Sequence, residues 1–289
     1  MKNKLYRKFL LGRIWKRIYL ERLGEPFIYN LISLFIFLFG SYRKKIAYDL
    51  IPRQSYACGI DLACRTAQRF GVKKLAIIEF GVAGGGGLLN MVSITDRFRK
   101  ETDIEFKVVG FDTGTGMPPP IDFRDHPEQY QEGDFPMYSQ EKLIASLPSN
   151  AKLYIGVVGE RLNTFFNELP SDYKIGFISI DVDYYSSTKQ ALEVLKSDAD
   201  KYLPFVPMYF DDVNDMSHNE YCGELLAIKE FNQDTNEMRK ITKLSQLKIW
   251  RFFKHSFWLD RMYMAHIFDS KYRAPKKRGN IILDNPYLK

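Results

Sequence analysis

The sequence predicts an α/β protein with a doubly wound, mostly parallel sheet and an N-terminal helical extension. Three observations support this fold class. From residue 51 onward, short apolar runs of strand length alternate with stretches of helical periodicity. A glycine-rich turn follows the first of these runs, and two later runs each end in paired acids. Strands that alternate with helices form parallel sheets, and ligands bind at the carboxyl edge of such sheets.

The expected strands and helices follow one another in a regular order. We expect strands at residues 75–80, 106–111, 152–158, 175–180 and 207–210, and helices at residues 59–70, 88–98, 141–147, 162–169, 187–199 and 223–232. The final segments, residues 241–253 and 262–268, are candidates for two more strands. A loop rich in Pro, Gly and Asp, residues 113–137, interrupts the series, and loops of that length are usually functional.

Charge is distributed unevenly over the 289 residues, whose net charge is +7. Residues 1–50 hold 11 Lys or Arg and 3 Asp or Glu, a net charge of +8, so the remaining chain is close to neutral. A nucleic-acid-binding body would carry its own basic surface, and we therefore expect no nucleic acid partner. The odd number of cysteines, 3, argues against a disulfide framework and for a reducing, cytoplasmic setting.

Composition divides the chain into an N-terminal segment, residues 1–50, and a body, residues 51–289. Apolar and basic residues over positions 1–25 have the pattern of a basic amphipathic helix. Residues 27–39 form a nearly unbroken apolar run of 13 residues, which is short for a bilayer span. Three arrangements stay open. They are packing on the body or on a second subunit of a homo-oligomer, peripheral contact with the inner face of a membrane through residues 1–45, and a true span.

The glycine-rich turn follows the predicted strand 75–80 and precedes a helix. Glycine lets the backbone turn sharply and lets a ligand approach the chain closely. The turn is neither a P-loop nor a clean dinucleotide motif; its distinguishing mark is Glu79, two residues before Gly81. Asp112 ends the next strand, where a carboxylate commonly accepts hydrogen bonds from ribose hydroxyls. The alternative role of Asp112 is to cap the turn at Thr113 and Gly114.

Four acids follow two later strands at the same edge of the predicted sheet. Asp181 and Asp183 come after residues 175–180, and Asp211 and Asp212 come after residues 207–210. Converging carboxylates repel one another unless a cation shares them, so the pattern predicts a divalent metal site. The alternative for Asp181 and Asp183 is to cap the helix that starts near Ser187.

Four motifs occur in one order along the chain and carry a family resemblance. They are Glu79-Phe-Gly-Val-Ala-Gly-Gly-Gly, Phe111-Asp-Thr-Gly-Thr-Gly-Met-Pro, Asp181-Val-Asp-Tyr-Tyr-Ser-Ser-Thr and Asp211-Asp212. Residues 70–235 thereby resemble a class I S-adenosylmethionine-dependent methyltransferase, and more narrowly the macrocin O-methyltransferase family, which methylates sugar hydroxyls on natural products. Two places depart from the family pattern: Thr113-Gly114 stands where the family has Ser-Phe, and residues 203–207 replace its Pro-Gly-Gly.

The resemblance implies a Rossmann-like methyltransferase fold, S-adenosylmethionine and Mg²⁺ as cofactors, and a small-molecule or glycan acceptor. The implied function is O-methyl transfer to a hydroxyl of a sugar, glycan or natural product. The alternative is an inactive methyltransferase-fold scaffold or a membrane-attached interaction protein. The implied site residues are Glu79, Gly81, Val82, Ala83, Gly84, Gly85, Asp112 and Asp181 for the methyl donor, Asp181, Asp211 and Asp212 for the metal, and Asp181 and Asp183 as catalytic candidates.

Overall fold

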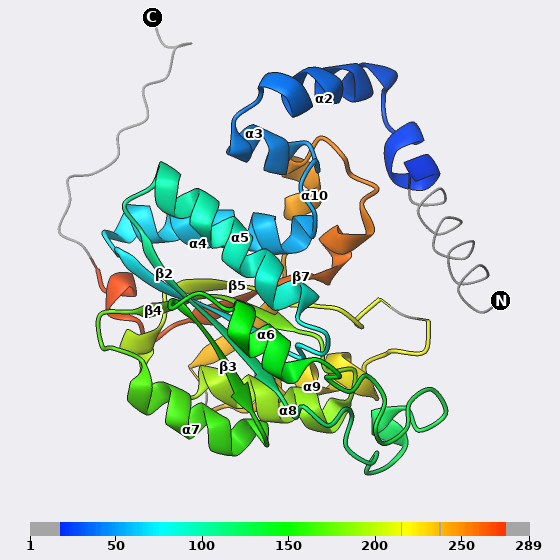
Figure 1. Ribbon diagram of the computed structural model, residues 1–289, viewed down its shortest axis with the longest axis vertical. Helices are drawn as coiled ribbons and strands as arrows, with labels where there is room; N and C mark the ends of the chain where they lie inside the picture. The colour runs from blue at the N-terminus through cyan, green and yellow to red at the C-terminus, as the bar shows by residue number, and fades with distance from the viewer. Residues whose placement is uncertain (1–17, 215, 237, 276–289) are drawn as a thin grey trace, which may run out of the picture.

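A seven-stranded sheet forms the centre of the molecule in the computed structural model, which describes residues 18–214, 216–236 and 238–275 (Figure 1). The strand order is β3-β2-β1-β4-β5-β7-β6. The first five strands run parallel, and β7 runs antiparallel to both of its neighbours. The strands are β1 (Lys74–Phe80), β2 (Glu105–Asp112), β3 (Ala151–Ile155), β4 (Lys174–Ile180), β5 (Phe205–Phe210), β6 (Arg239–Lys243) and β7 (Met262–Ile267).

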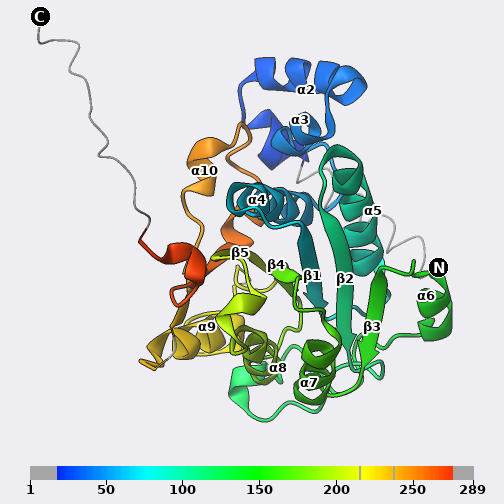
Figure 2. The ribbon, with the colours of Figure 1, turned by 90° about the vertical axis from the view of Figure 1, so that its left-hand side faces the viewer.

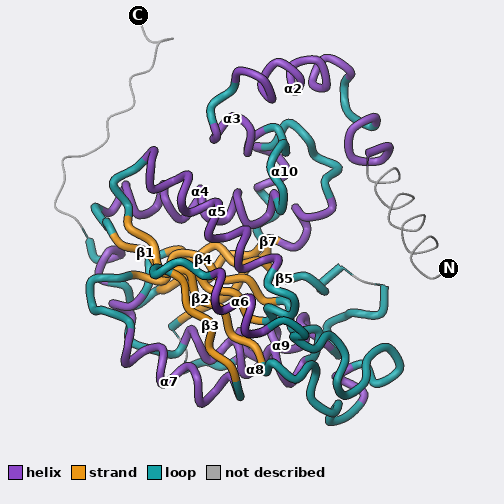
Figure 3. Tube along the Cα trace, in the orientation of Figure 1, coloured by secondary structure: helices purple, strands orange, loops and turns teal. Residues whose placement is uncertain are grey.

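Helices cover both faces of the sheet, which confirms the doubly wound architecture. Figure 2 shows α4 and α5 on one side and α7, α8 and α9 on the other, and Figure 3 shows the strands running together between these two layers. The helices of the body are α4 (Gln54–Phe70), α5 (Gly86–Glu101), α6 (Gln140–Ser146), α7 (Val158–Glu168), α8 (Tyr185–Leu192), α9 (Gly223–Gln233) and α10 (Leu247–Trp250).

Several predicted elements differ from the structure, and the helices predicted at residues 59–70 and 162–169 begin earlier, at Gln54 and Val158. The predicted strand 241–253 stops at Lys243 and is followed by α10, because the partner strand β7 begins at Met262 and offers no pairing beyond this point. The predicted strand 152–158 ends at Ile155, and α7 already begins at Val158. The predicted helix 187–199 starts two residues earlier and its α-helical part ends at Leu192.

Aromatic side chains tie the first three strands together within the core. Phe80 pairs in register with Phe111, which pairs with Tyr154. Their rings stack in a row, with centroids 4.9 Å apart in the first pair and 5.2 Å apart in the second. Neighbouring aromatic residues on adjacent strands stabilise a sheet beyond the burial of their area. This row lies directly before the carboxyl edge and fixes the strand ends that carry the glycine turn and Asp112.

Strand β1 lies between β2 and β4, where the order of the strands reverses. Open α/β sheets bind ligands in the crevice at this point, outside the carboxyl ends of the strands. The register places Phe80 opposite Ile180 and Ile180 opposite Phe210. The residues that follow these three are Gly81, Asp181 and Asp211, and they therefore leave the carboxyl edge of the sheet side by side.

The N-terminal segment is helical, with a short turn (Ile18–Leu23) and the helices α2 (Phe27–Phe39) and α3 (Tyr42–Ala47). It packs at the end of the molecule beside α4 and α10 (Figure 1). Most of the predicted basic amphipathic helix, residues 1–17, lies outside the described residues. In the part of the chain that the structure describes, every helix is too short or too polar to cross a bilayer.

Candidate active site

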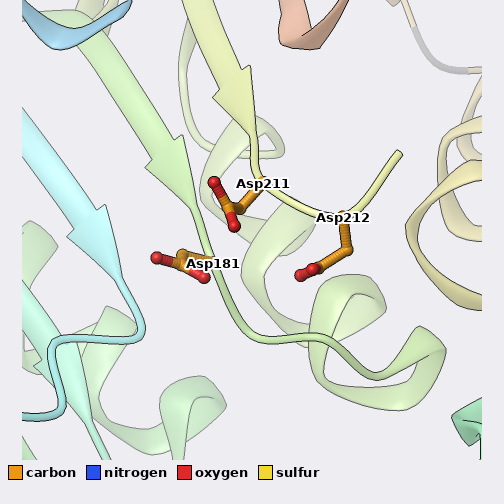
Figure 4. A group of neighbouring side chains, drawn as sticks. All are labelled: Asp181, Asp211 and Asp212. Atoms are coloured by element: carbon orange, nitrogen blue, oxygen red, sulfur yellow. The ribbon is translucent and has the colours of Figure 1, made fainter. Parts of the chain in front are cut away.

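Three carboxylates meet where β4 and β5 end, as Figure 4 shows. Asp181, Asp211 and Asp212 each offer an oxygen, and these oxygens lie within 4.8 Å of one another. Burial, followed by repulsion from Asp211 and Asp212, raises the pKa of Asp181 well above its ordinary value. The predicted convergence of these acids is thus confirmed, and a set of carboxylate oxygens at this spacing suits a hard divalent cation such as Mg²⁺.

The fourth acid, Asp183, lies beside this group rather than within it. Its backbone adopts a left-handed conformation with φ of 56°, which is uncommon for a residue other than glycine. The side chain of Tyr130 forms a hydrogen bond with its carboxylate, yet burial keeps the pKa of Asp183 above the ordinary value. Strained backbone of this kind concentrates at functional sites. Asp183 therefore differs from Asp181 in its position and in the side chains that surround it.

Neither acid caps the helix that follows, so the capping alternative is wrong. The cap of α8 comes instead from Asp125 in the loop 113–137. Its Oδ1 accepts from the backbone N–H of Ser186 at 2.8 Å, and its Oδ2 accepts from the Ser186 hydroxyl at 2.8 Å. The carboxylate is completely buried. This contact fastens the loop to the helix beside the acids and leaves Asp181 and Asp183 available to a ligand.

A buried glutamate supports the acid group from behind. Glu224, in the first turn of α9, is fully buried, and its Oε2 accepts from the backbone N–H of Asp212 at 3.0 Å. Burial and the nearby Asp212 raise the pKa of Glu224 well above its ordinary value. The sequence gives little indication of this role, because an acid in the first turn of a helix is common on electrostatic grounds alone.

One arginine balances part of the negative charge. Arg261, directly before β7, donates from Nη1 to Oδ1 of Asp211 at 2.6 Å and lies 3.3 Å from the hydroxyl of Tyr209. The Tyr209 hydroxyl also donates to Asp211. These contacts fix the orientation of Asp211, as hydrogen bonds to ligating carboxylates do in metal sites.

Two glycines in and after the turn lie so close to acidic residues that they leave no room for a side chain. Gly81 has φ of +83°, and a Cβ built on it would lie 1.7 Å from the carbonyl oxygen of Asp181. A Cβ on Gly87 would lie 1.7 Å from Oε1 of Glu79. Gly85 precedes α5 in a left-handed conformation and packs against Leu143, away from the turn's open side.

Glu79 is a buried acid at the base of the turn. It accepts from the hydroxyl of Tyr56 at 2.8 Å, and that hydroxyl in turn lies 3.0 Å from the hydroxyl of Ser179. Burial raises the pKa of Glu79 from 4.5 to about 7, against the opposing effects of Tyr56 and Arg53. Its other carboxylate oxygen, Oε2, is buried without a hydrogen-bond partner. A buried acid with an open acceptor suits a ligand that brings a positive charge or a donor.

Asp112 joins the two loops at the carboxyl edge. Its Oδ2 accepts from the backbone N–H groups of Val82 and Ala83, each at 2.8 Å, and its Oδ1 accepts from that of Gly114 at 2.7 Å. The predicted turn cap is thus present. Each carboxylate oxygen has more than one acceptor position, so these bonds leave room for a further donor.

One cavity of about 660 Å³ connects the two groups of residues. It is large enough for a cofactor-sized ligand. The loop 113–137 contributes Met117, Asp134 and Phe135 to its wall, as expected for a loop that covers the site. Among the sequence-predicted site residues, Gly85 and Asp212 are not part of its lining. The others face the cavity: Glu79, Gly81, Val82, Ala83, Gly84, Asp112, Asp181, Asp183 and Asp211.

Arg53 was not predicted as a site residue. It stands in a left-handed turn directly before α4, lines the cavity near the glycine turn, and brings to the site a second cation besides Arg261. Its Nη1 lies 3.4 Å from the Tyr56 hydroxyl. The only sequence signal is its place before the first helix of the body, which does not indicate that the chain folds back to the carboxyl edge.

The strand order, the glycine turn at the switch point and the acids beside it define the Rossmann-like fold of class I methyltransferases. No family model and no curated protein matches the sequence. The chain is similar in structure to the O-methyltransferase NovP, with 14% identity, 73% of this chain and 79% of NovP covered, and a TM-score of 0.50.

Two other solved structures are similar over comparable lengths. The calicheamicin methyltransferase CalS11 shares 20% identity over 71% of this chain and 83% of its own, with a TM-score of 0.46. The O-methyltransferase TomG from Streptomyces achromogenes, in complex with SAM, shares 13% identity over 72% of this chain and 78% of its own, with a TM-score of 0.39. The likeness to NovP concerns the fold, and it agrees with the predicted fold class.

Proposed function

We propose that the protein is an S-adenosylmethionine-dependent O-methyltransferase that acts, with the help of a divalent cation, on a hydroxyl of a sugar, glycan or natural product. One observation carries the proposal: a single cavity joins the glycine turn and Asp112 to Asp181, Asp183 and Asp211. A methyl donor and an acceptor have to lie side by side, and this cavity offers adjoining places with different chemistry.

The residues around the glycine turn fit the methyl donor. The open Oε2 of Glu79 would accept from its α-ammonium group, and Arg53 would pair with its α-carboxylate. The two close glycines would let the chain approach the ligand, and Asp112 would accept from the ribose hydroxyls. The buried, partnerless Oε2 of Glu79 is the feature that best supports this fit.

The acid residues fit a cation and an acceptor hydroxyl. Bound together, S-adenosylmethionine supplies an activated methyl group and a divalent cation lowers the pKa of a hydroxyl. Asp181, Asp211 and Asp212 would hold the cation, and Arg261 would keep Asp211 in place. Asp183, whose pKa is raised and whose carboxylate Tyr130 orients, would accept the proton of the hydroxyl at a carboxylate oxygen.

The acceptor is proposed from the lining of the cavity and from the chemistry of similar folds. The loop 113–137 places polar and aromatic residues, among them Asp134 and Phe135, beside the acids. That mixture suits a hydroxylated ligand with apolar ring faces, such as a sugar. NovP, similar in fold, is an O-methyltransferase, and this supports oxygen as the receiving atom.

Calorimetric titration with S-adenosylmethionine, with and without Mg²⁺, tests the proposal. We expect heat of binding in both cases and methyl transfer in a screen of glycans, lipid-linked sugars and hydroxylated natural products only when the cation is present. Absence of heat under both conditions would contradict the enzymatic function and favour a scaffold that keeps the fold without turnover.

A further inference from the structure

Helix α2 carries a broad apolar surface that faces solvent. Its exposed side chains cover more than half of the helix circumference, and no charged residue occurs between Phe27 and Phe39. In both views α2 lies at one end of the molecule, apart from the sheet (Figures 1 and 2). We call this surface the α2 apolar face; its members, each more than half exposed, are Phe27, Ile28, Leu31, Leu34, Phe35, Phe37, Leu38 and Phe39.

The opposite side of α2 is fastened to the protein, so the apolar face has a fixed direction. Arg22, in the turn before α2, donates from Nη2 to the backbone carbonyls of Tyr48 and Asp49 at 2.9 and 2.7 Å. Its Nη1 lies 3.3 Å from the hydroxyl of Ser33, one of the buried residues of α2. The polar contacts of the segment thus lie on the side of α2 that faces the rest of the protein.

A second set of contacts joins the segment to the distant residues 251–256. Asp49 is buried and pairs with Arg251, and it accepts from the hydroxyl of Ser256 at 2.8 Å. Glu25 is also buried and lies 2.8 Å from Nδ1 of His255. The buried ion pair of Asp49 with Arg251 joins segments far apart in sequence and holds α2 as part of the folded protein, because losing one partner would leave a buried charge.

The length of α2 excludes a bilayer span and suits a helix that lies along a surface. Thirteen residues extend about 20 Å, whereas the hydrocarbon core is about 30 Å thick. An apolar patch of this size in contact with water marks an interaction site.

Charge decides between a second copy of the chain and a lipid surface. Lys44 and Lys45 follow α2 closely, and residues 1–17 contain seven Lys or Arg and no acid. Two copies that met through this face would bring two segments of net charge +8 together. An anionic bilayer attracts the same charges, each basic residue near the surface adding to the affinity.

We propose that the α2 apolar face inserts among the lipid headgroups of an anionic bilayer and holds the protein on that surface as a peripheral membrane protein. Lys44 and Lys45 after α2 would pair with the lipid phosphates, and the apolar side chains would reach the acyl boundary. This inference is independent of the proposed enzymatic function.

Flotation of the full chain with vesicles tests it. We expect binding to phosphatidylcholine vesicles that contain about 30% phosphatidylglycerol, and weak binding to pure phosphatidylcholine. Phe35→Glu should lower the partition coefficient at least about tenfold, because it places a charge where an apolar ring enters the lipid. Lys44→Gln should lower it about fivefold, through the loss of one lipid-facing charge.

The matched control is Val157→Glu, a substitution of another exposed apolar side chain, 55% exposed. It directly precedes α7, which both views place at the far end of the molecule from α2. Its vesicle binding should equal that of the unchanged protein, and circular dichroism should show all variants folded. Equal binding of Phe35→Glu and the control would overturn the proposal. So would a lipid-free dimer, detected by analytical ultracentrifugation, that Phe35→Glu dissociates, because a second copy would then cover the face.

Discussion

The guanidinium of Arg261 holds the carboxylate of Asp211 at 2.6 Å, joining an antiparallel strand near the end of the chain to the parallel half of the sheet. Asp211 follows β5, and Arg261 precedes β7, which pairs with β5. The antiparallel strand therefore does more than close the sheet edge. It brings one positive charge to a group of acids that repel one another.

Arg261→Met should make the protein more dependent on a divalent cation for stability. In the presence of a chelator we expect a loss of about 1 kcal/mol, a modest value because both side chains are about one-third exposed and partly screened. Added Mg²⁺ should restore most of that loss, since it takes over the neutralisation of the acids. Thermal unfolding with and without Mg²⁺ measures both quantities; an equal loss under the two conditions would contradict this role.

The variants Asp181→Asn and Asp183→Asn should distinguish the roles of two acids that lie only two positions apart in the sequence. Asp181→Asn should raise the melting temperature in chelator by a few degrees, because it removes a buried charge that its acidic neighbours repel. It should also abolish Mg²⁺ binding in calorimetry. Asp183→Asn should keep Mg²⁺ and S-adenosylmethionine affinity while turnover falls about 10²- to 10⁴-fold.

Asp172→Asn is the control for both variants, because Asp172 is an exposed acid at the opposite end of β4 that pairs with Lys74. It should leave metal affinity and turnover unchanged. Loss of Mg²⁺ affinity in Asp183→Asn would instead assign this residue to the metal site.

Binding of S-adenosylmethionine should strengthen as the pH rises through 7. The pKa of Glu79 in the free protein is raised to about 7, so its carboxyl is mostly protonated below that pH and cannot pair with an ammonium group. Affinity should fall about tenfold for each pH unit below 7 and level off above it. Glu79→Gln should bind more weakly, with a flat profile between about pH 5.5 and about 7.5. Calorimetry at constant ionic strength measures the profile; an unchanged slope in the variant would exclude Glu79 as its origin.

Asp125→Ala should release the loop 113–137 from α8. The buried carboxylate would no longer cap Ser186, and loss of a cap typically costs about 1 kcal/mol. We expect faster proteolysis within the loop and a raised KM for the acceptor, with little change in S-adenosylmethionine affinity. Asp122→Ala is the control, because that half-buried acid contacts Arg124 within the loop itself. Equal protease sensitivity of the two variants would contradict the anchoring role of Asp125.

Much of the fold follows from the local pattern of the sequence. Each of the strands β1, β2, β4 and β5 is an apolar run that ends at a glycine or an acid, and that pattern needs no tertiary information. The local pattern did not predict the end of β6 at Lys243, because a strand continues only as far as a partner strand pairs with it. The pairing with β7, which begins at Met262, sets that limit and local propensity does not.

The sequence predicted the site residues that follow the ends of neighbouring strands. It did not predict the site residues that other segments, distant in sequence, bring to the same place. Asp181 and Asp211 are placed by strand register, which the alternation of elements already implies. Glu224 and Arg261 reach the same place through a helix and an antiparallel strand, and their sequence surroundings resemble those of any surface charge. Asp125, buried within a loop, became recognisable only through its contact with Ser186.

The ion pair between Asp49 and Arg251 also sets an order of events during synthesis. The two residues are 202 positions apart, and Ser256, the other partner of Asp49, emerges from the ribosome later still. Strand β7, which fills the gap between β5 and β6, is also made after both of its neighbours. For most of translation, therefore, the partners of Glu25 and Asp49 in residues 251–256 do not yet exist. A ribosome stalled before residue 251 would carry α2 held by the contacts of Arg22 alone, without its connection to the end of the chain.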